Sequence, residues 1–143
     1  DMPRLQFWTL LGPMFTGPVP SCLGQMKNLL RVQIEDCTHS GPIDPFFGGS
    51  LTESLILTGC AFTGTIPMLD NFLSLTNLNL QNNRLEGSVP DIVGLPALTE
   101  LDVSDNSITS VGTLEGADSL IVRLGRNSIS AFPLSLFDLP GVS

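Results

Sequence analysis

The sequence predicts a solenoid, a coil of short repeated units in which each unit adds one strand to a parallel β-sheet. Three observations support this fold class. An apolar pattern recurs every 21 to 24 residues along the 143-residue chain, and a repeat of that length is typical of stacked repeat arrays. Within each unit, apolar residues alternate with outward-facing ones over a few positions, as in a short strand. Most units then enter a turn containing glycine or proline, which ends the strand.

The best-formed unit spans residues 75–90 and reads Leu-x-x-Leu-x-Leu-x-x-Asn-x-Leu-x-Gly-x-Val-Pro. Six units begin near residues 5, 29, 52, 75, 98 and 119, at steps of 24, 23, 23, 23 and 21 residues. One inner position is apolar in every unit: Leu10, Ile34, Leu57, Leu80, Val103 and Leu124. We therefore predict a single domain over residues 1–143, uncapped at both ends, whose equivalent side chains stack in continuous internal columns.

The segments that return from one strand to the next are short. Each begins at a proline and carries two or three apolar residues, as in residues 20–26, 90–95 and 133–137. Their length allows a helical or 3₁₀ turn but not a long helix. Because this return side is bulkier than the strand side, we expect the sheet to be concave.

Three turns share one motif. Residues 15–20 read Phe-Thr-Gly-Pro-Val-Pro, residues 62–67 Phe-Thr-Gly-Thr-Ile-Pro, and residues 85–90 Leu-Glu-Gly-Ser-Val-Pro. With the repeat pattern, these turns resemble leucine-rich repeats of the plant-type subclass. The resemblance implies an α/β-type solenoid: a right-handed superhelix with a concave parallel β-sheet and a short 3₁₀, helical or irregular convex side. It also implies a segment of a longer array, exposed outside the cell or at its surface.

One position of the repeat, where the chain turns away from the sheet, is asparagine in three of the six units. An asparagine amide donates and accepts hydrogen bonds at once, so it can connect adjacent turns whose backbone groups lack partners. We predict this structural role, and not ligand binding, for Asn83, Asn106 and Asn127. Cys37 and Cys60 occupy the same position in two earlier units.

The three cysteines allow more than one interpretation. We interpret Cys22, Cys37 and Cys60 as buried, unreactive thiols. One alternative is a Cys37–Cys60 disulfide, since stacked positions fall near the required Cα separation. Another is a bond between Cys22 and a cysteine outside this sequence.

Composition argues against several functions. The net charge of −8 opposes binding to nucleic acid, which requires a basic surface. No apolar run reaches membrane-spanning length, so we expect no direct membrane insertion by this segment. With one histidine and no Cys-x-x-Cys motif, we expect no metal site and no cofactor.

No catalytic residue is predicted. His39 stands where other units have Phe, Leu or Ile, and we interpret it as a neutral side chain packed in its turn. Paired carboxylates perform acid–base chemistry only in an enclosed site that shifts their pKa. An open sheet provides no such enclosure, so we interpret the outward acids as a solvated face: Glu35, Asp36, Glu100, Asp102 and Asp105.

The concave face is the predicted binding surface, since repeat solenoids bind partners there. Its candidate ligand-binding residues are Arg31, Gln33, Glu35, Ser54, Ile56, Asn77, Asn79, Gln81, Glu100, Asp102, Arg123 and Arg126. We expect a non-catalytic module that binds a protein, peptide or glycan. The alternative is a structural array that associates with itself through uncapped ends into a coat or filament.

Overall fold

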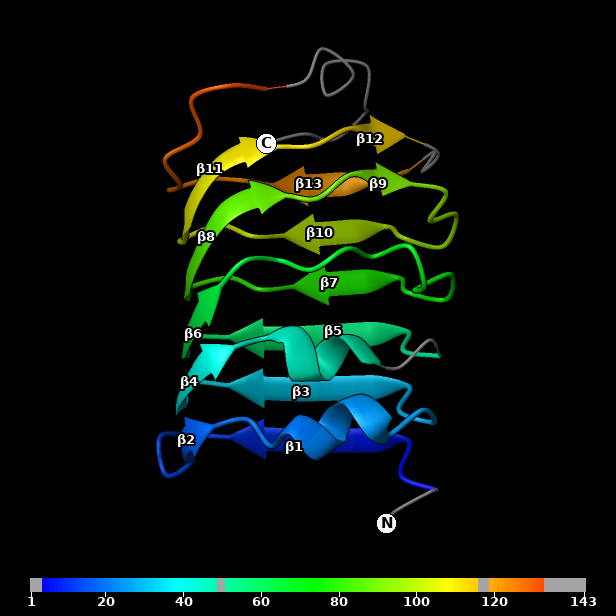
Figure 1. Cartoon of the computed structure of the whole chain (residues 1–143), viewed down its shortest axis with the longest axis vertical. Helices are drawn as coiled ribbons and strands as arrows, with labels where there is room; N and C mark the ends of the chain where they lie inside the picture. Colours follow the sequence, from blue (N-terminus) through cyan, green and yellow to red (C-terminus); the bar gives the residue numbers. More distant parts are fainter. Residues whose placement is uncertain (1–3, 49–50, 116–118, 133–143) are drawn as a thin grey trace.

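The computed structural model describes residues 4–48, 51–115 and 119–132. Its main element is a six-stranded parallel sheet whose strands are stacked in chain order along the long axis (Figure 1). Each strand begins two residues after one of the predicted unit starts. The strands are β1 (Phe7–Leu11), β3 (Arg31–Glu35), β5 (Ser54–Thr58), β7 (Asn77–Asn79), β10 (Glu100–Asp102) and β13 (Ile121–Arg123).

The register of this sheet forms the core. Val32, Leu55, Leu78 and Leu101 are paired from strand to strand, and each is at most 2% exposed. Burying one such aliphatic side chain stabilises the fold by roughly 1.5–3 kcal/mol. The column exists only when units stack, because a single unit has nothing to cover its leucines. The predicted right-handed parallel-strand solenoid is confirmed.

A left-handed residue ends each sheet strand. Asp36, Asn82, Asp105 and Arg126 have φ between 51° and 56°, and Gly59 has φ of 62° at the same position of its unit. The backbone N–H of Asp36 donates to Thr58 O in the next unit at 3.0 Å, and later units repeat this contact. These side chains therefore lie in one row along the carboxyl ends of the strands.

A second sheet follows the first on one flank of the solenoid (Figure 1). Its five parallel strands come from the turns that follow the sheet strands, and four of the five contain a glycine. They are β2 (Thr16–Pro18), β4 (Thr38–Pro42), β6 (Ala61–Gly64), β8 (Arg84–Val89) and β11 (Ser107–Val111).

The return side is short, as predicted, but not uniform. It contains two 3₁₀ helices, η1 (Ser21–Gln25) and η2 (Asp44–Gly48). Residues 90–95, whose length allowed a helical or 3₁₀ turn, instead contain the strand β9 (Ile92–Val93), which pairs with β12 (Leu114–Glu115). β-branched residues favour strands, and a partner strand is present. The turn predicted for residues 133–137 lies outside the described residues.

The asparagines connect neighbouring units. Asn106 Nδ2 donates to Leu80 O of the preceding unit at 2.9 Å and to Val103 O of its own unit at 3.1 Å. Its Oδ1 accepts the Leu85 N–H at 2.9 Å. Asn83 and Asn127 make equivalent contacts. These hydrogen bonds join backbone groups of adjacent turns, which is the type of contact predicted for the three asparagines.

The interpretation of the cysteines as buried thiols is wrong. Cys37 and Cys60 form a disulfide with a Cα–Cα distance of 4.8 Å, because stacking brings equivalent positions of adjacent units within bonding range. Cys22 is an exposed free cysteine on η1.

His39 is packed in its turn, as predicted. Its ring lies between Phe15 and Phe62, with centroid distances of 6.4 and 6.5 Å. His39 Nδ1 is 2.9 Å from Gly17 O, and because a carbonyl only accepts, Nδ1 carries the proton. The imidazole therefore continues an aromatic column between units.

Candidate binding site on the open sheet face

The twelve candidate binding residues lie on five of the six sheet strands, β3, β5, β7, β10 and β13, or within three residues after them. They share the outward side, opposite the buried column. Two of them are less accessible than predicted: Ser54 is 9% exposed and Asp102 is 6% exposed. Asp102 Oδ1 accepts hydrogen bonds from the backbone N–H and the hydroxyl of Ser104. Side chains on adjacent strands are close enough to cover small or short residues between them.

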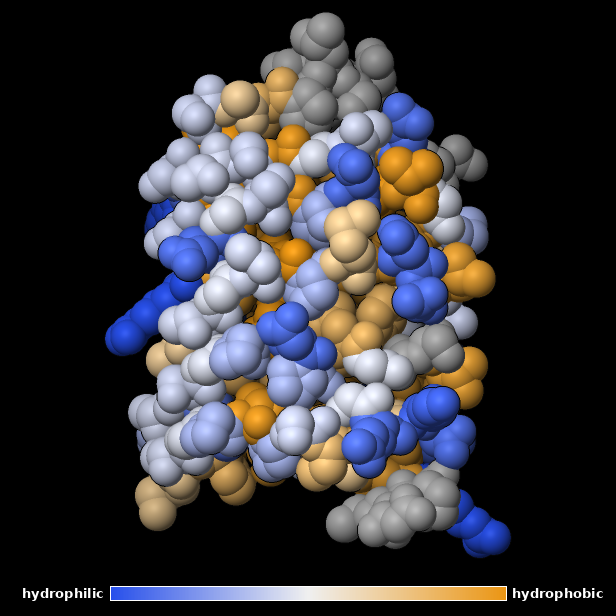
Figure 2. Space-filling view, viewed as in Figure 1, coloured by the Kyte–Doolittle hydropathy of each residue, from blue (hydrophilic) through white to orange (hydrophobic). Residues whose placement is uncertain are grey.

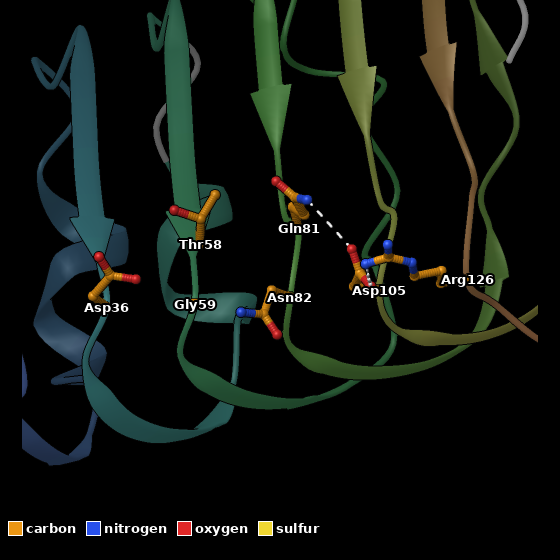
Figure 3. A pocket seen from close by; sticks show the side chains of 7 residues that line it. All are labelled: Asp36, Thr58, Gly59, Gln81, Asn82, Asp105 and Arg126. Atoms are coloured by element: carbon orange, nitrogen blue, oxygen red, sulfur yellow. Dashed lines mark hydrogen bonds and ion pairs between the residues drawn. The ribbon is translucent and has the colours of Figure 1, made fainter.

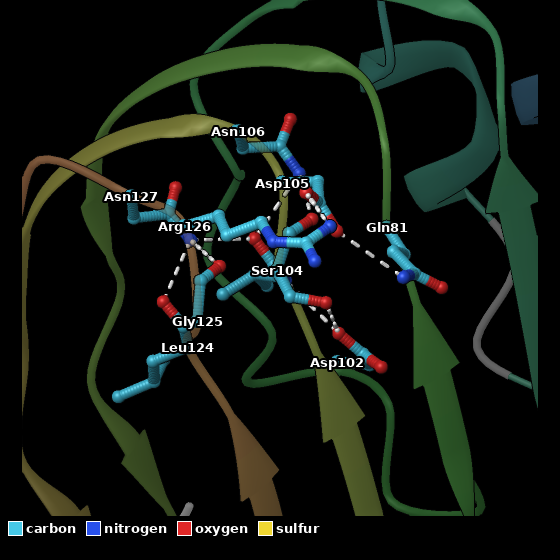
Figure 4. Close-up of polar contacts among 10 residues, drawn as sticks. Gln81, Asp102, Ser104, Asp105, Asn106, Leu124, Gly125, Arg126 and Asn127 are labelled. Atoms are coloured by element: carbon cyan, nitrogen blue, oxygen red, sulfur yellow. Dashed lines mark hydrogen bonds and ion pairs between the residues drawn. The ribbon is translucent and has the colours of Figure 1, made fainter.

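Two polar rows cross the units at the C-terminal end of this face. In one, Glu100 accepts a hydrogen bond from Asn77 Nδ2 at 2.8 Å and pairs with Arg123. In the other, Asp105 accepts from Gln81 Nε2 at 3.3 Å and pairs with Arg126 at 3.0 Å (Figure 4). Glu100 and Asp105 are therefore paired within the chain while their side chains remain partly exposed.

The second row changes the acidity of Asp105. The hydrogen bond from Arg126 is the largest effect and holds the pKa of Asp105 below its ordinary value, because it favours the ionised carboxylate. The hydrogen bond from Gln81 acts in the same direction. Asp105 is therefore an ionised carboxylate that already has its partners, Arg126 and Gln81, within the chain.

At the N-terminal end of the face, fewer polar side chains are paired across units than at the C-terminal end. Arg31 lies over the ring of Phe7, 6.0 Å from its centroid, and Gln33 Nε2 donates to Glu35 Oε1 at 3.0 Å. Phe7 and Leu11 are 59% and 57% exposed. This end therefore offers apolar surface beside charged groups.

A groove runs along the carboxyl ends of the strands, over five consecutive units (Figure 3). Its volume is about 340 Å³. At a strand spacing of about 4.8 Å, five units extend over roughly 19 Å, the length of about six residues of extended peptide. The lining residues are Asp36, Thr58, Gly59, Gln81, Asn82, Asp105 and Arg126.

Only Gln81 and Arg126 of the twelve candidates line this groove. The other ten lie along the sheet face. The remaining lining residues were missed because Asp, Asn and Gly at these positions share no chemistry. What unites them is position: each occupies the last strand position or the left-handed position before the Asn/Cys column. That position was a usable signal, since a turn placed there must point its side chains past the strand ends.

The return side differs from the groove. Figure 2 shows hydrophobic side chains there as separate patches among hydrophilic ones.

Among the described residues, no cluster of three or more His, Cys, Asp or Glu is placed to hold a metal ion. No helix in the same residues is long and apolar enough to cross a membrane.

The chain is similar to known proteins in sequence and in fold. A family description, "Leucine Rich repeats (2 copies)", matches residues 73–116. A probable LRR receptor-like serine/threonine-protein kinase of Arabidopsis thaliana is 36% identical over 129 residues, which is 87% of this chain and 11% of the relative. Receptor like protein 22 of the same plant is 34% identical over 90 residues, or 62% of this chain and 11% of the relative. The chain thus spans about a tenth of these relatives.

Among solved structures, the plant peptide hormone receptor RGFR1 in complex with RGF2 is similar, with a TM-score of 0.70 and 26% identity. The match covers 77% of this chain and 18% of that chain. Sheet, turns and relatives agree: the chain belongs to the leucine-rich-repeat family. Its Gly-x-Ile-Pro and Gly-x-Val-Pro turns place it in the plant-type subclass of that family.

Proposed function

We propose that this chain is an extracellular recognition module that binds an extended peptide along its open sheet face and strand-end groove. The observation that carries the proposal is the groove itself, which is open, polar and long enough for about six extended residues. Side-chain amides and carboxylates from successive units line it at strand spacing. An extended peptide carries backbone donors and acceptors about every 3.3 Å, so polar groups along the whole groove can pair with several of them.

Two further observations support the proposal. Disulfides persist mainly in oxidising compartments, so the Cys37–Cys60 bond favours a position outside the cell. The relatives are named as receptor-like proteins, and one structural neighbour is named as a peptide hormone receptor in complex with its peptide. A site this open favours binding over catalysis, because it does not exclude water from a reacting group.

A peptide-display selection tests the proposal. Random twelve-residue peptides are selected on the wild-type chain and then measured on two variants by fluorescence anisotropy. Ile56→Glu adds a charge to the middle of the sheet face, where Ile56 is half-buried on β5. Thr63→Glu adds the same charge to an exposed position of β6 on the flanking sheet.

We expect selected peptides to bind wild type and Thr63→Glu alike and Ile56→Glu at least tenfold more weakly. Loss of binding in both variants, or in neither, would contradict a ligand on the sheet face. Concentration-dependent polymers in light scattering, with no peptide enriched, would instead favour the structural array.

A further inference from the structure

Asp36 and Asp105 occupy the same position in two units that are three repeats apart. Both follow a sheet strand, both have left-handed backbone, with φ of 51° and 55°, and both line the groove. They differ in what the neighbouring units place beside them. The chain thus places an aspartate at the same position of two units, in two different environments.

At Asp105 the neighbouring units provide two partners. Arg126, one unit later, pairs with the carboxylate at 3.0 Å, and Gln81, one unit earlier, donates to it at 3.3 Å. At Asp36 the residue equivalent to Arg126 is Gly59, and the residue equivalent to Gln81 is Leu11. The two ion pairs of the described residues involve Glu100 and Asp105, so neither uses Asp36.

Gly59 places no side chain, and so no cation, beside Asp36. A Cβ atom built on Gly59 would lie 2.5 Å from Asp36 Oδ1, so the Asp36 carboxylate lies against the Gly59 backbone, in the space that a side chain at this position would need. Figure 3 shows Asp36 at one end of the groove, with Thr58 and Gly59 next to it, and the Asp105–Arg126 pair at the other end. The exposed side chain of Leu11 belongs to the strand-end position of the preceding unit.

We infer that Asp36 is the anionic half of a cation subsite, which accepts the guanidinium or ammonium group of a basic residue in the bound peptide. The ligand's cation takes the place beside Asp36 that Arg126 takes beside Asp105. Its aliphatic stem lies toward Leu11, as the stems of arginine and lysine cover apolar surface. The net charge of −8 attracts such a ligand from a distance.

This inference rests on the proposed function but is tested without a selected peptide. The probes are four capped pentapeptides of glycine and serine that differ at the central residue: arginine, lysine, citrulline or norleucine. Citrulline is the neutral isostere of arginine, and norleucine retains the apolar stem of lysine. Binding to ¹⁵N-labelled protein is followed by NMR at the backbone amides of Asp36, Gly59 and Asn82.

Three variants accompany wild type. Asp36→Asn removes the charge. Gly59→Arg supplies the cation from within the chain after the Asp36 carboxylate rotates away from the new Cβ atom, and Arg126 shows that arginine adopts this left-handed conformation. Asp70→Asn is the matched control, since Asp70 is an exposed acid at a separate site lined by Lys27 and Leu73.

We expect the two charged peptides to bind wild type and Asp70→Asn about fivefold more tightly than the neutral ones, as for an exposed ion pair. Asp36→Asn and Gly59→Arg should remove this preference. Equal binding of all four peptides to wild type would overturn the subsite and leave the proposed function to the display selection. A preference that survives in Asp36→Asn would overturn the assignment to Asp36.

Discussion

Units two and three are connected differently from units four to six, at the same position of the repeat. In the earlier pair, the Cys37–Cys60 disulfide joins the two turns. In the later units, Asn83, Asn106 and Asn127 join them with side-chain amides that reach backbone groups of the preceding unit. One connection is covalent and the other consists of hydrogen bonds, yet both hold successive strands in register.

The difference extends to the binding face. Around the asparagines, outward charges are paired across units, as with Asp105 and Arg126. Around the disulfide, Asp36 lies against Gly59 and has no ion pair among the described residues. Neither connection uses the outward charged groups, since the asparagine amides reach backbone carbonyls. The difference in charge pairing therefore comes from the strand-end residue of the next unit, which is Arg126 beside Asp105 and Gly59 beside Asp36.

Removing the disulfide should have the largest effect. In Cys37→Ala/Cys60→Ala the free energy of unfolding should fall by about 3 kcal/mol, because the bond closes a loop across 23 positions of sequence. Urea unfolding followed by circular dichroism measures the change. Cys37→Asn/Cys60→Asn should recover part of the loss if the two connections are equivalent. No recovery would show that asparagine works only beside another asparagine.

Asn106→Ala should cause the second-largest loss of stability. It leaves the Leu85 N–H and the Leu80 carbonyl without their side-chain partner, at a cost of about 1–3 kcal/mol. The same urea experiment applies, with exposed Ser107→Ala as the matched control. An unchanged unfolding midpoint in Asn106→Ala would show that the asparagine hydrogen bonds between units do not contribute to stability.

His39→Leu should cost about 1 kcal/mol, because it removes one hydrogen bond to Gly17 O and the stacking against Phe15 and Phe62. His39→Phe keeps the aromatic column and should lose less. Thermal unfolding of the two variants compares them directly. If both lose the same amount, the hydrogen bond, and not the stacking, is what His39 contributes.

The smallest effect concerns pH. The pKa of Asp105 is lowered in the folded chain, chiefly by Arg126. Its contribution is therefore fully present above the unfolded pKa and is lost as the pH falls through the lower folded value. Wild type should lose slightly more stability than Arg126→Gln between about pH 5 and pH 2. If the urea midpoints of wild type and Arg126→Gln change with pH in the same way, the Arg126–Asp105 ion pair does not contribute to stability.

Sequence alone predicted the repeating structure well. The column of Leu57, Leu80 and Val103 and the role of Asn106 follow from local patterns, since a buried position must be apolar and a turn must satisfy its backbone. The disulfide was less predictable. The repeat placed Cys37 and Cys60 at the same position, but a thiol and a disulfide both fit a half-buried turn.

The groove was also missed as a unit. Gln81 and Arg126 were predicted as part of a broad face, whereas Asp36, Gly59 and Asn82 shared no residue type with them. Only their backbone conformation and their place at the strand ends bring them together. The strand β9 was missed because two residues are too short for a periodic signal.

The period, the strand positions and the buried columns were determined by the sequence itself, because each depends on residue types at fixed spacing within one unit. The tertiary structure decided which charges meet: Arg126 lies against Asp105, while Gly59 places no cation beside Asp36. That choice depends on side chains from different units, about 23 residues apart, whose contacts exist only after the units have stacked.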